Sequence, residues 1–397
     1  MQKFLRLAFF LALIAGPLSA QVRHLGDVEV PVDKNSIAVR VSANTTELNA
    51  LALMAFGSDG AYVVRGYDYA YDIRFTLVGP AEVRLDIMKG RQTTPALSQL
   101  VPGTSARNAL LRAADIAVDR TNPFGLRGYF TSRLTFVGEG TGKKEIYTSD
   151  LFLGDVKRIT NDHALALSPR WSPDGSKILY TSYARSGFPD ILELNLATMR
   201  QTVFASFRGT NTGARYSPNG SQVAMVLSGT GSPEIWIANA RGGSAPVRRT
   251  HSDEAKSSPC WSPDGSRIVF AMQPGPQLFV MSAGGGGLQR LRTGYSYTAE
   301  PDWSRTNPNK IACTVMAGGY QIAVYDFSTG RAEVVSRAPF DGIEPCWLPD
   351  GRHLVYTART RTSSVLCILD TVTGKSTSLT HGSAVGNAMQ ACVWTPR

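Results

Sequence analysis

Trp171-Ser172-Pro173-Asp174-Gly175 is a phrase that the chain repeats. It returns with small changes as Tyr216-Ser217-Pro218-Asn219-Gly220, Trp261-Ser262-Pro263-Asp264-Gly265 and Trp347-Leu348-Pro349-Asp350-Gly351. Trp303-Ser304 begins a degenerate copy, and Trp394-Thr395-Pro396 is a shortened copy near the C-terminus. Successive aromatic residues of the series are 45, 45, 42, 44 and 47 positions apart. Such a period is typical of a β-propeller, in which each repeat forms one four-stranded blade.

The local chemistry of the phrase predicts a turn that leads into a strand. Serine at the first position, proline at the second and glycine at the fourth favour a type I turn. An alternating apolar segment follows the phrase each time, at residues 177–181, 222–226, 267–271 and 352–356. A turn signal between two strand patterns indicates a hairpin. We expect the aromatic residue ahead of each turn to pack between neighbouring sheets.

The two ends of the repeat region predict how the propeller closes. Three strand-like segments, residues 133–137, 145–148 and 156–160, precede Trp171 without a turn phrase of their own. A single strand, Met389–Trp394, follows the last full repeat. Three strands and one strand make a blade, so we expect the C-terminal strand to pair with the strand at 131–137 and close the ring. The predicted fold is mainly β, with a six-bladed propeller at residues 129–397.

A different pattern in residues 36–128 predicts a small α/β domain ahead of the propeller. The expected elements, in chain order, are a strand at 37–41, a helix at 47–56, strands at 61–66, 73–78 and 82–88, and a helix at 106–120. Thr45 or Thr46 would cap the first helix, and Thr104 or Ser105 the second. No G-x-G-x-x-G motif follows a strand, which argues against a nucleotide-binding domain.

Residues 1–20 have the features of a secretory signal peptide. Lys3 and Arg6 provide its basic start, an apolar run follows, and the segment ending at Ala20 resembles a cleavage site. A membrane anchor is the alternative, although the apolar run is short for a bilayer span. Residues 21–35 would form a flexible leader of the exported protein.

The sequence contains few signals of catalysis or of nucleic-acid binding. The formal net charge of +10 falls to +8 without Lys3 and Arg6, and the basic residues form no run, so a generally basic soluble surface is the simpler interpretation. No G-x-S-x-G hydrolase motif occurs. The five histidines are scattered, and His353 on its strand is expected to be structural.

The five cysteines lack metal-ligand spacing, and we interpret them as small buried hydrophobic side chains rather than disulfide partners. We therefore predict no catalytic residue, no metal and no cofactor. A site assembled from several blades would escape such local patterns.

The connections between blades differ from one repeat to the next, whereas the turn phrases are alike. All of these connections must lie at one mouth of the ring, where variable charged and aromatic side chains suit a protein partner. The candidate binding residues are His163, Arg208, Asn211, Asp253, Glu254, Tyr295, Tyr297, Phe340, Asp341 and His381. Ordinary solvated loops are the alternative interpretation.

The order of signal, leader, α/β domain and propeller resembles the TolB-like family of the Tol-Pal system. The segments Arg170–Ile178, Ala299–Trp303 and Ile343–Gly351 are typical of that family, as is the joint that begins at Ala113. The resemblance covers essentially the whole chain, and the order of the domains carries more of it than the blade phrases do.

The resemblance implies a periplasmic scaffold without catalytic activity, a monomer that supports outer-membrane integrity and cell division. Its mouth would bind a Pal-like peptidoglycan-associated lipoprotein. Its leader would bind a TolA-like inner-membrane protein, through Val22, Arg23, Val28, Val30 and Val32 of this chain.

Two other functions remain open from the residues alone. A secreted propeller of the same build could bind another protein or an envelope glycan outside a Tol system. An enzyme with a site in the central channel is the other possibility, and convergent acids or histidines in that channel would favour it.

Overall fold

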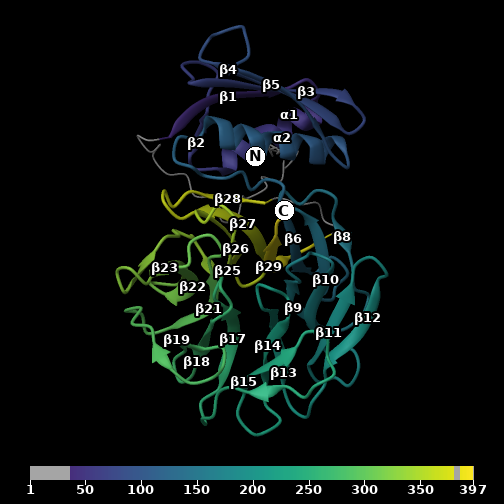
Figure 1. Cartoon of the computed structure of the whole chain (residues 1–397), viewed down its shortest axis with the longest axis vertical. Coiled ribbons are helices and arrows are strands. Elements are labelled where there is room, and N and C mark those ends of the chain that lie inside the picture. Colours follow the sequence, from purple (N-terminus) through teal and green to yellow (C-terminus); the bar gives the residue numbers. More distant parts are fainter. Residues whose placement is uncertain (1–35, 380–384, 397) are drawn as a thin grey trace, which may run out of the picture.

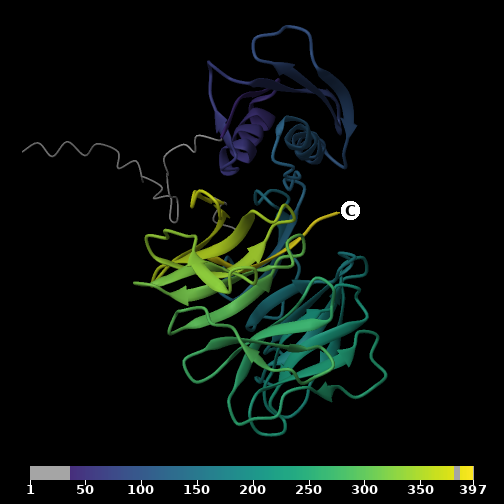
Figure 2. The ribbon, with the colours of Figure 1, turned by 60° about the vertical axis from the view of Figure 1, so that its left-hand side comes forward.

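The computed structural model describes residues 36–379 and 385–396. The predicted signal peptide, the leader with its five candidate residues, and His381 lie outside the described residues. Figures 1 and 2 show an α/β domain stacked on one end of a propeller. Within the described ranges, no helix has both the length and the apolar character that a bilayer span requires.

The α/β domain is a five-stranded sheet with two helices on the side that faces the propeller (Figure 2). In sheet order the strands are β2 (Tyr62–Val64), β1 (Ile37–Ala43), β3 (Tyr71–Gly79), β4 (Glu82–Lys89) and β5 (Leu97–Pro102). The helices are α1 (Thr46–Ser58) and α2 (Ala106–Thr121). β1 pairs in parallel with β2 and β3, and the remaining pairs are antiparallel.

The helix starts follow from capping, and the one missed strand follows from weak patterning. The Oγ1 atom of Thr45 accepts the N–H of Leu48 at 3.3 Å, and the Oγ atom of Ser105 accepts the N–H of Asn108 at 3.1 Å. β5 was not predicted from the sequence. It is an edge strand in which Val101 alone is buried, so it carries no apolar alternation.

The propeller has six four-stranded blades, each built around a ladder of antiparallel hairpins. Blade 1 contains β29 (Ala388–Trp394), β6 (Arg133–Gly138), β7 (Glu145–Asp150) and β8 (Lys157–Arg158). Blade 2 contains β9 (Ala166–Trp171), β10 (Lys177–Ser182), β11 (Asp190–Asn195) and β12 (Arg200–Ala205). Blade 3 contains β13 (Asn211–Tyr216), β14 (Gln222–Leu227), β15 (Glu234–Asn239) and β16 (Val247–Arg248).

The other three blades repeat the same order. Blade 4 contains β17 (Lys256–Trp261), β18 (Arg267–Met272), β19 (Gln277–Ser282) and β20 (Gln289–Arg290). Blade 5 contains β21 (Thr298–Trp303), β22 (Lys310–Met316), β23 (Tyr320–Asp326) and β24 (Arg331–Val334). Blade 6 contains β25 (Asp341–Trp347), β26 (His353–Arg359), β27 (Ser364–Asp370) and β28 (Ser376–Ser378).

The predicted ring closure is confirmed. β29 pairs antiparallel with β6, with Trp394 opposite Arg133 and Met389 opposite Val137. Figure 1 shows β29 next to β6. β29 is the innermost strand of its blade and pairs with β6 only, so closure covers the inner edge of β6.

The repeated phrase forms the turn that the sequence predicts, and its aromatic residue joins neighbouring blades. The N–H of Gly175 donates to the carbonyl of Ser172 at 2.9 Å, and Gly175 has a φ of 72°. The indole N–H of Trp171 donates to the Cys392 carbonyl in the preceding blade at 3.1 Å. Trp261 and Trp347 make the equivalent bonds, to the carbonyls of Arg215 and Asp302.

The α/β domain meets blade 6 through a buried cluster of charged groups around His353, the first residue of β26. The His353 side chain is fully buried, with Nδ1 2.6 Å from a carboxylate oxygen of Asp350 and Nε2 3.5 Å from one of Asp59, just past the end of α1. The ring also packs on Tyr129, with centroids 4.8 Å apart. The histidine expected to be structural thus lies at the contact between the two domains.

Burial opposes a charged imidazole, but the carboxylates of Asp350 and Asp59 outweigh it and raise the pKa of His353 to about 9. Burial also raises the pKa of Asp59. Gly60 brings the backbone so close to the propeller that an added Cβ would lie 1.8 Å from an Asp370 oxygen. The junction is therefore both tightly packed and dependent on protonation.

Deleting residues 389–397 should leave the inner edge of β6 unpaired and remove Trp394, whose indole N–H bonds the Pro173 carbonyl at 3.1 Å. We expect aggregation, because an exposed strand edge pairs with other chains. Size-exclusion chromatography with light scattering and thermal melting measure the effect. A truncation after Thr395, which retains β29, is the matched control. A monomeric 389–397 deletion with an unchanged melting temperature would contradict closure by β29.

Stability should fall as pH rises from about 6.5 to about 9, because the raised pKa of His353 favours its charged form in the folded state. The contribution of His353 to the free energy of unfolding is complete below pH 6.5, and it is lost as the pH rises through the folded-state pKa of about 9. We expect His353→Gln to lower the free energy of unfolding at pH 6.5 by about 3 kcal/mol and to flatten this pH dependence. Urea unfolding across this range is the measurement.

The control for that experiment is His251→Gln, because His251 is exposed. It should change the free energy of unfolding by no more than about 0.5 kcal/mol at either pH. An unaltered pH slope in the His353 variant would show that another group governs the junction.

Candidate functional site at the propeller mouth and channel

The direction of the strands separates the two ends of the propeller. Each innermost strand runs from an inter-blade connection to a turn phrase, or in β29 to the shortened copy. The turn-phrase end faces the α/β domain, because Arg127 and Gly128 line a cavity of about 590 Å³ there together with Pro173, Pro218 and other turn residues. The variable connections therefore gather at the opposite end, the mouth of the propeller.

The predicted binding residues occupy different environments at the mouth. His163, Arg208, Asp253, Glu254 and Phe340 are exposed, whereas Tyr295, Tyr297 and Asp341 are half-buried. Asn211 is only 1% exposed. Its side-chain amide donates to the carbonyls of Phe207 and Pro189, at 2.7 and 3.1 Å, so it holds the loop in place and is not available to a partner.

Three apolar side chains at the mouth were missed from the sequence. Phe188, Phe207 and Leu165 are 69%, 48% and 43% exposed, and all three lie in the loops of blade 2. The loops touch one another, because the Asn211 amide bonds the Pro189 carbonyl and the N–H of Tyr183 donates to the Leu165 carbonyl. The connections between blades were the predicted binding loops, but the hairpin between β10 and β11 opens at the same end and presents Phe188.

Buried polar residues at the start of the third strands hold the mouth loops. The Glu234 side chain is fully buried and accepts hydrogen bonds from the Thr250 hydroxyl and from the N–H of Ser252 at 2.7 Å. It also pairs with Lys256 at 3.0 Å. Burial opposes its charge, but these donors outweigh burial and lower the pKa of Glu234. The same position is Glu145 in blade 1, and its carboxylate accepts the N–H of His163 at 3.1 Å.

A groove of about 520 Å³ lies at the mouth between blades 5 and 6. Phe340 and Asp341 line it with Arg359 and Arg361. Asp341 and Arg359 form an ion pair at 3.2 Å. The groove thus combines an exposed aromatic ring with basic groups.

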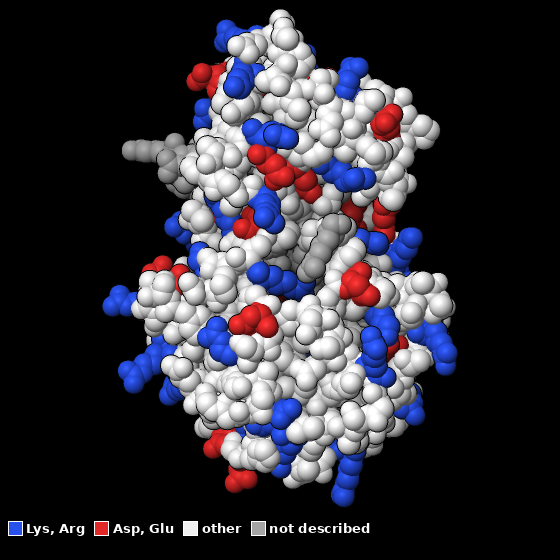
Figure 3. Space-filling model, viewed as in Figure 1, with Lys and Arg blue, Asp and Glu red and all other residues white. Residues whose placement is uncertain are grey.

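Charged side chains are mixed on the face of the molecule seen in Figure 3. Lys and Arg groups are scattered there with Asp and Glu groups between them. This arrangement agrees with the generally basic surface expected from the sequence.

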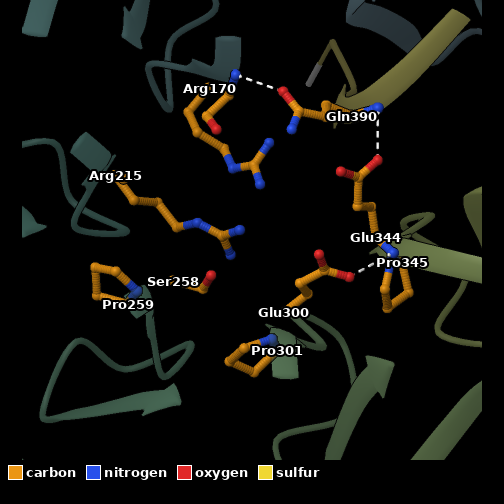
Figure 4. A pocket seen from close by; sticks show the side chains of 11 residues that line it. Arg170, Arg215, Ser258, Pro259, Glu300, Pro301, Glu344, Pro345 and Gln390 are labelled. Atoms are coloured by element: carbon orange, nitrogen blue, oxygen red, sulfur yellow. Dashed lines mark hydrogen bonds between the residues drawn. The ribbon is translucent and has the colours of Figure 1, made fainter. Parts of the chain in front are cut away.

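A ring of bulges lines the central channel. In every blade one residue of the innermost strand has a positive φ, between 53° and 66°, and the innermost ladder shifts register there. It lies three positions before the repeat aromatic in five blades and four positions before Trp394 in blade 1. The six residues are Ser168, Gly213, Ser258, Glu300, Glu344 and Gln390, and all of them line one cavity (Figure 4). Left-handed backbone is costly for residues other than glycine and recurs at functional positions. The only sequence signal was a proline after four of the six residues.

The long side chains of this ring link one blade to the next. Glu300 accepts the N–H of Glu344 at 3.0 Å, Glu344 accepts the N–H of Gln390 at 3.0 Å, and Gln390 accepts the N–H of Ser168 at 2.8 Å. Burial, with the neighbouring Glu344 charge, raises the pKa of Glu300. The sequence did not bring these residues together, because they lie in different blades.

A second ring lies one step closer to the α/β domain and contains three of the five cysteines. Its members are Arg170, Arg215, Cys260, Asp302, Cys346 and Cys392. All five cysteines are buried as predicted, but these three also form polar contacts. The Cys260 and Cys346 thiols accept the N–H groups of Trp303 and Val393 at 3.3 Å. The neighbouring Cys346 thiol, helped by Arg170, outweighs burial and lowers the pKa of Cys392.

In the described part of the chain, no cluster of three or more His, Cys, Asp or Glu residues has a geometry that would hold a metal ion.

Comparison with known proteins agrees with this architecture. The family model of the TolB beta propeller domain matches residues 124–397. The Tol-Pal system protein TolB of Bordetella pertussis is 31% identical over 237 residues, which cover 59% of this chain and 50% of that protein. The Tol-Pal system proteins TolB of Bordetella parapertussis and Bordetella bronchiseptica show the same identity and coverage. The matched region thus spans about half the length of these curated relatives.

Solved structures extend the similarity of fold to the α/β domain. The crystal structure of TolB from Acinetobacter baumannii superposes with a TM-score of 0.79 at 21% identity, covering 94% of this chain and 100% of that one. A putative TolB from Agrobacterium tumefaciens superposes with a TM-score of 0.52 at 18% identity, covering 67% of this chain and 99% of that one. With the family model matching most of the chain, the protein belongs to the TolB β-propeller family.

Proposed function

We propose that this protein is a periplasmic binding scaffold of a Tol-Pal system and that its mouth binds a Pal-like peptidoglycan-associated lipoprotein. One observation carries the proposal. In a chain of the TolB family, exposed aromatic side chains lie at the end of the propeller that the α/β domain leaves open. Phe188 and Phe207 lie on blade 2, and Phe340 lies on the connection into blade 6.

The physical properties of the mouth suit a protein partner. Aromatic residues carry much of the binding energy in protein interfaces, and charged residues around them set specificity. Phe340 is accompanied by Arg361, and Phe207 by Arg208. The loops that present these side chains are held by buried groups such as Asn211 and Glu234. Little conformational freedom is therefore lost when a partner binds.

The proposed export, the partner of the leader and the cellular role are those that the resemblance to the TolB-like family implies. We infer export through the signal at residues 1–20 and binding of a TolA-like protein by the leader at residues 21–35. The scaffold would thereby support outer-membrane integrity and cell division without catalysing a reaction. A monomer suffices for this role, since one chain closes the whole ring.

The direct test is binding of the Pal-like lipoprotein from the same genome, prepared without its lipid anchor. Calorimetry should detect binding to the full chain, and Phe340→Ala and Phe207→Ala should each weaken it at least about tenfold, because each removes an exposed ring from the interface. Tyr67→Ala is the matched control. Tyr67 is 76% exposed but lies on the α/β domain, so its removal should leave the affinity unchanged.

Two outcomes would count against the proposal. Absence of binding, with and without residues 21–35, would favour a propeller that recognises another protein or an envelope glycan outside a Tol system. Binding that is weakened by Tyr67→Ala but not by the two phenylalanine variants would place the partner on the α/β domain.

A further inference from the structure

The central channel contains a cavity whose walls carry opposite charge. Its volume is about 120 Å³, enough for about four waters at ~30 Å³ each. Figure 4 shows Arg170 and Arg215 reaching into it from blades 2 and 3, with Glu300 and Glu344 facing them from blades 5 and 6. The space exists because Ser168, Gly213 and Ser258 are short where the other three blades have long side chains.

On the cationic wall, one guanidinium group is available to a ligand. Arg215 already pairs with Asp302 at 2.7 Å. Arg170 donates to the carbonyl of its neighbour Pro169 at 2.9 Å, and no carboxylate among the described residues lies within ion-pair distance of it. A guanidinium group can bind a carboxylate with two parallel hydrogen bonds.

On the anionic wall, each carboxylate has one oxygen to spare. Glu300 and Glu344 accept hydrogen bonds at Oε2, from the N–H of the next blade and from Thr314 or Thr357. Among the described residues, nothing bonds either Oε1 atom. The side-chain amide nitrogen of Gln390 also makes no bond there, and Figure 4 shows it on the side of Arg170.

We propose that this cavity binds a small zwitterion of the amino-acid class. Its carboxylate would accept hydrogen bonds from Arg170 and Gln390, and its ammonium group would donate to the free Oε1 atoms of Glu300 and Glu344. A charge in a confined site is costly unless it is paired. A ligand with both charges satisfies both walls at once, whereas a simple anion or a simple cation satisfies only one.

The backbone supports a binding role for this ring. Five of its six residues are not glycine and still adopt left-handed backbone, and all five line the channel cavity. The volume limits the bound part of the ligand to about five or six non-hydrogen atoms, the size of glycine or alanine.

Calorimetry and thermal melting of the purified full chain test the proposal with glycine, alanine and β-alanine as ligands. Acetate and methylammonium each carry one of the two charges and serve as ligand controls. We expect the amino acids to bind with dissociation constants in about the micromolar to millimolar range and to raise the melting temperature. Acetate and methylammonium should bind at least about tenfold more weakly, because each leaves one wall unpaired.

Two substitutions separate the walls. Arg170→Gln removes the cation, and Glu344→Gln removes an anion while keeping an oxygen that can accept the Gln390 N–H. Each should weaken amino-acid binding at least about tenfold. Arg200→Gln and Glu333→Gln make the same chemical changes on exposed outer strands and should have no effect.

The ligand comparison on the unaltered protein needs no variant, so the test stands even if a substitution impairs folding. Equal binding of glycine and acetate, or of glycine and methylammonium, would overturn the proposal. So would the absence of amino-acid binding at millimolar concentration, which would mean that the cavity holds water only. Either result would leave the function proposed for the mouth untouched.

Discussion

The ladder between β29 and β6 is the contact on which the rest of the structure depends. It joins segments separated by most of the chain and completes the sixth sheet, so each blade is packed between two neighbours. Only a closed ring places six innermost strands around one axis. The mouth and the channel therefore exist as sites because Met389–Trp394 returns to the first blade.

Closure is reinforced by bonds that cross from blade to blade. Indole N–H groups of Trp171, Trp261 and Trp347 reach carbonyls of the preceding blade. The carboxylates of Glu300 and Glu344 accept hydrogen bonds from backbone N–H groups of the following blade. The two carboxylate bonds satisfy the N–H groups of the bulge residues Glu344 and Gln390, since a buried unpaired N–H is costly. The side chains that stabilise the ring thus also line the channel.

Most of the fold, but only part of the candidate site, could be predicted from the sequence. The period of the turn phrase predicted the blades, and both helices appeared where capping residues stood. β5 was not predicted, because only one of its six residues is buried and the strand therefore has no apolar alternation. Among the mouth residues, Asn211 was classed by its loop position, but its burial depends on contacts with Pro189, which no local pattern reveals.

What the sequence determined by itself was therefore local and periodic: turns, strand alternation, caps and the order of the blades. Side-chain periodicity and turn chemistry act within a few residues, so they can be recognised in one dimension. The tertiary structure decided which distant residues meet. Arg170 faces Glu344, and His353 meets Asp59, because the ring and the domain junction bring them together in space. Burial and electrostatic coupling depend on such distances, and the raised pKa values of His353 and Asp59 follow from them.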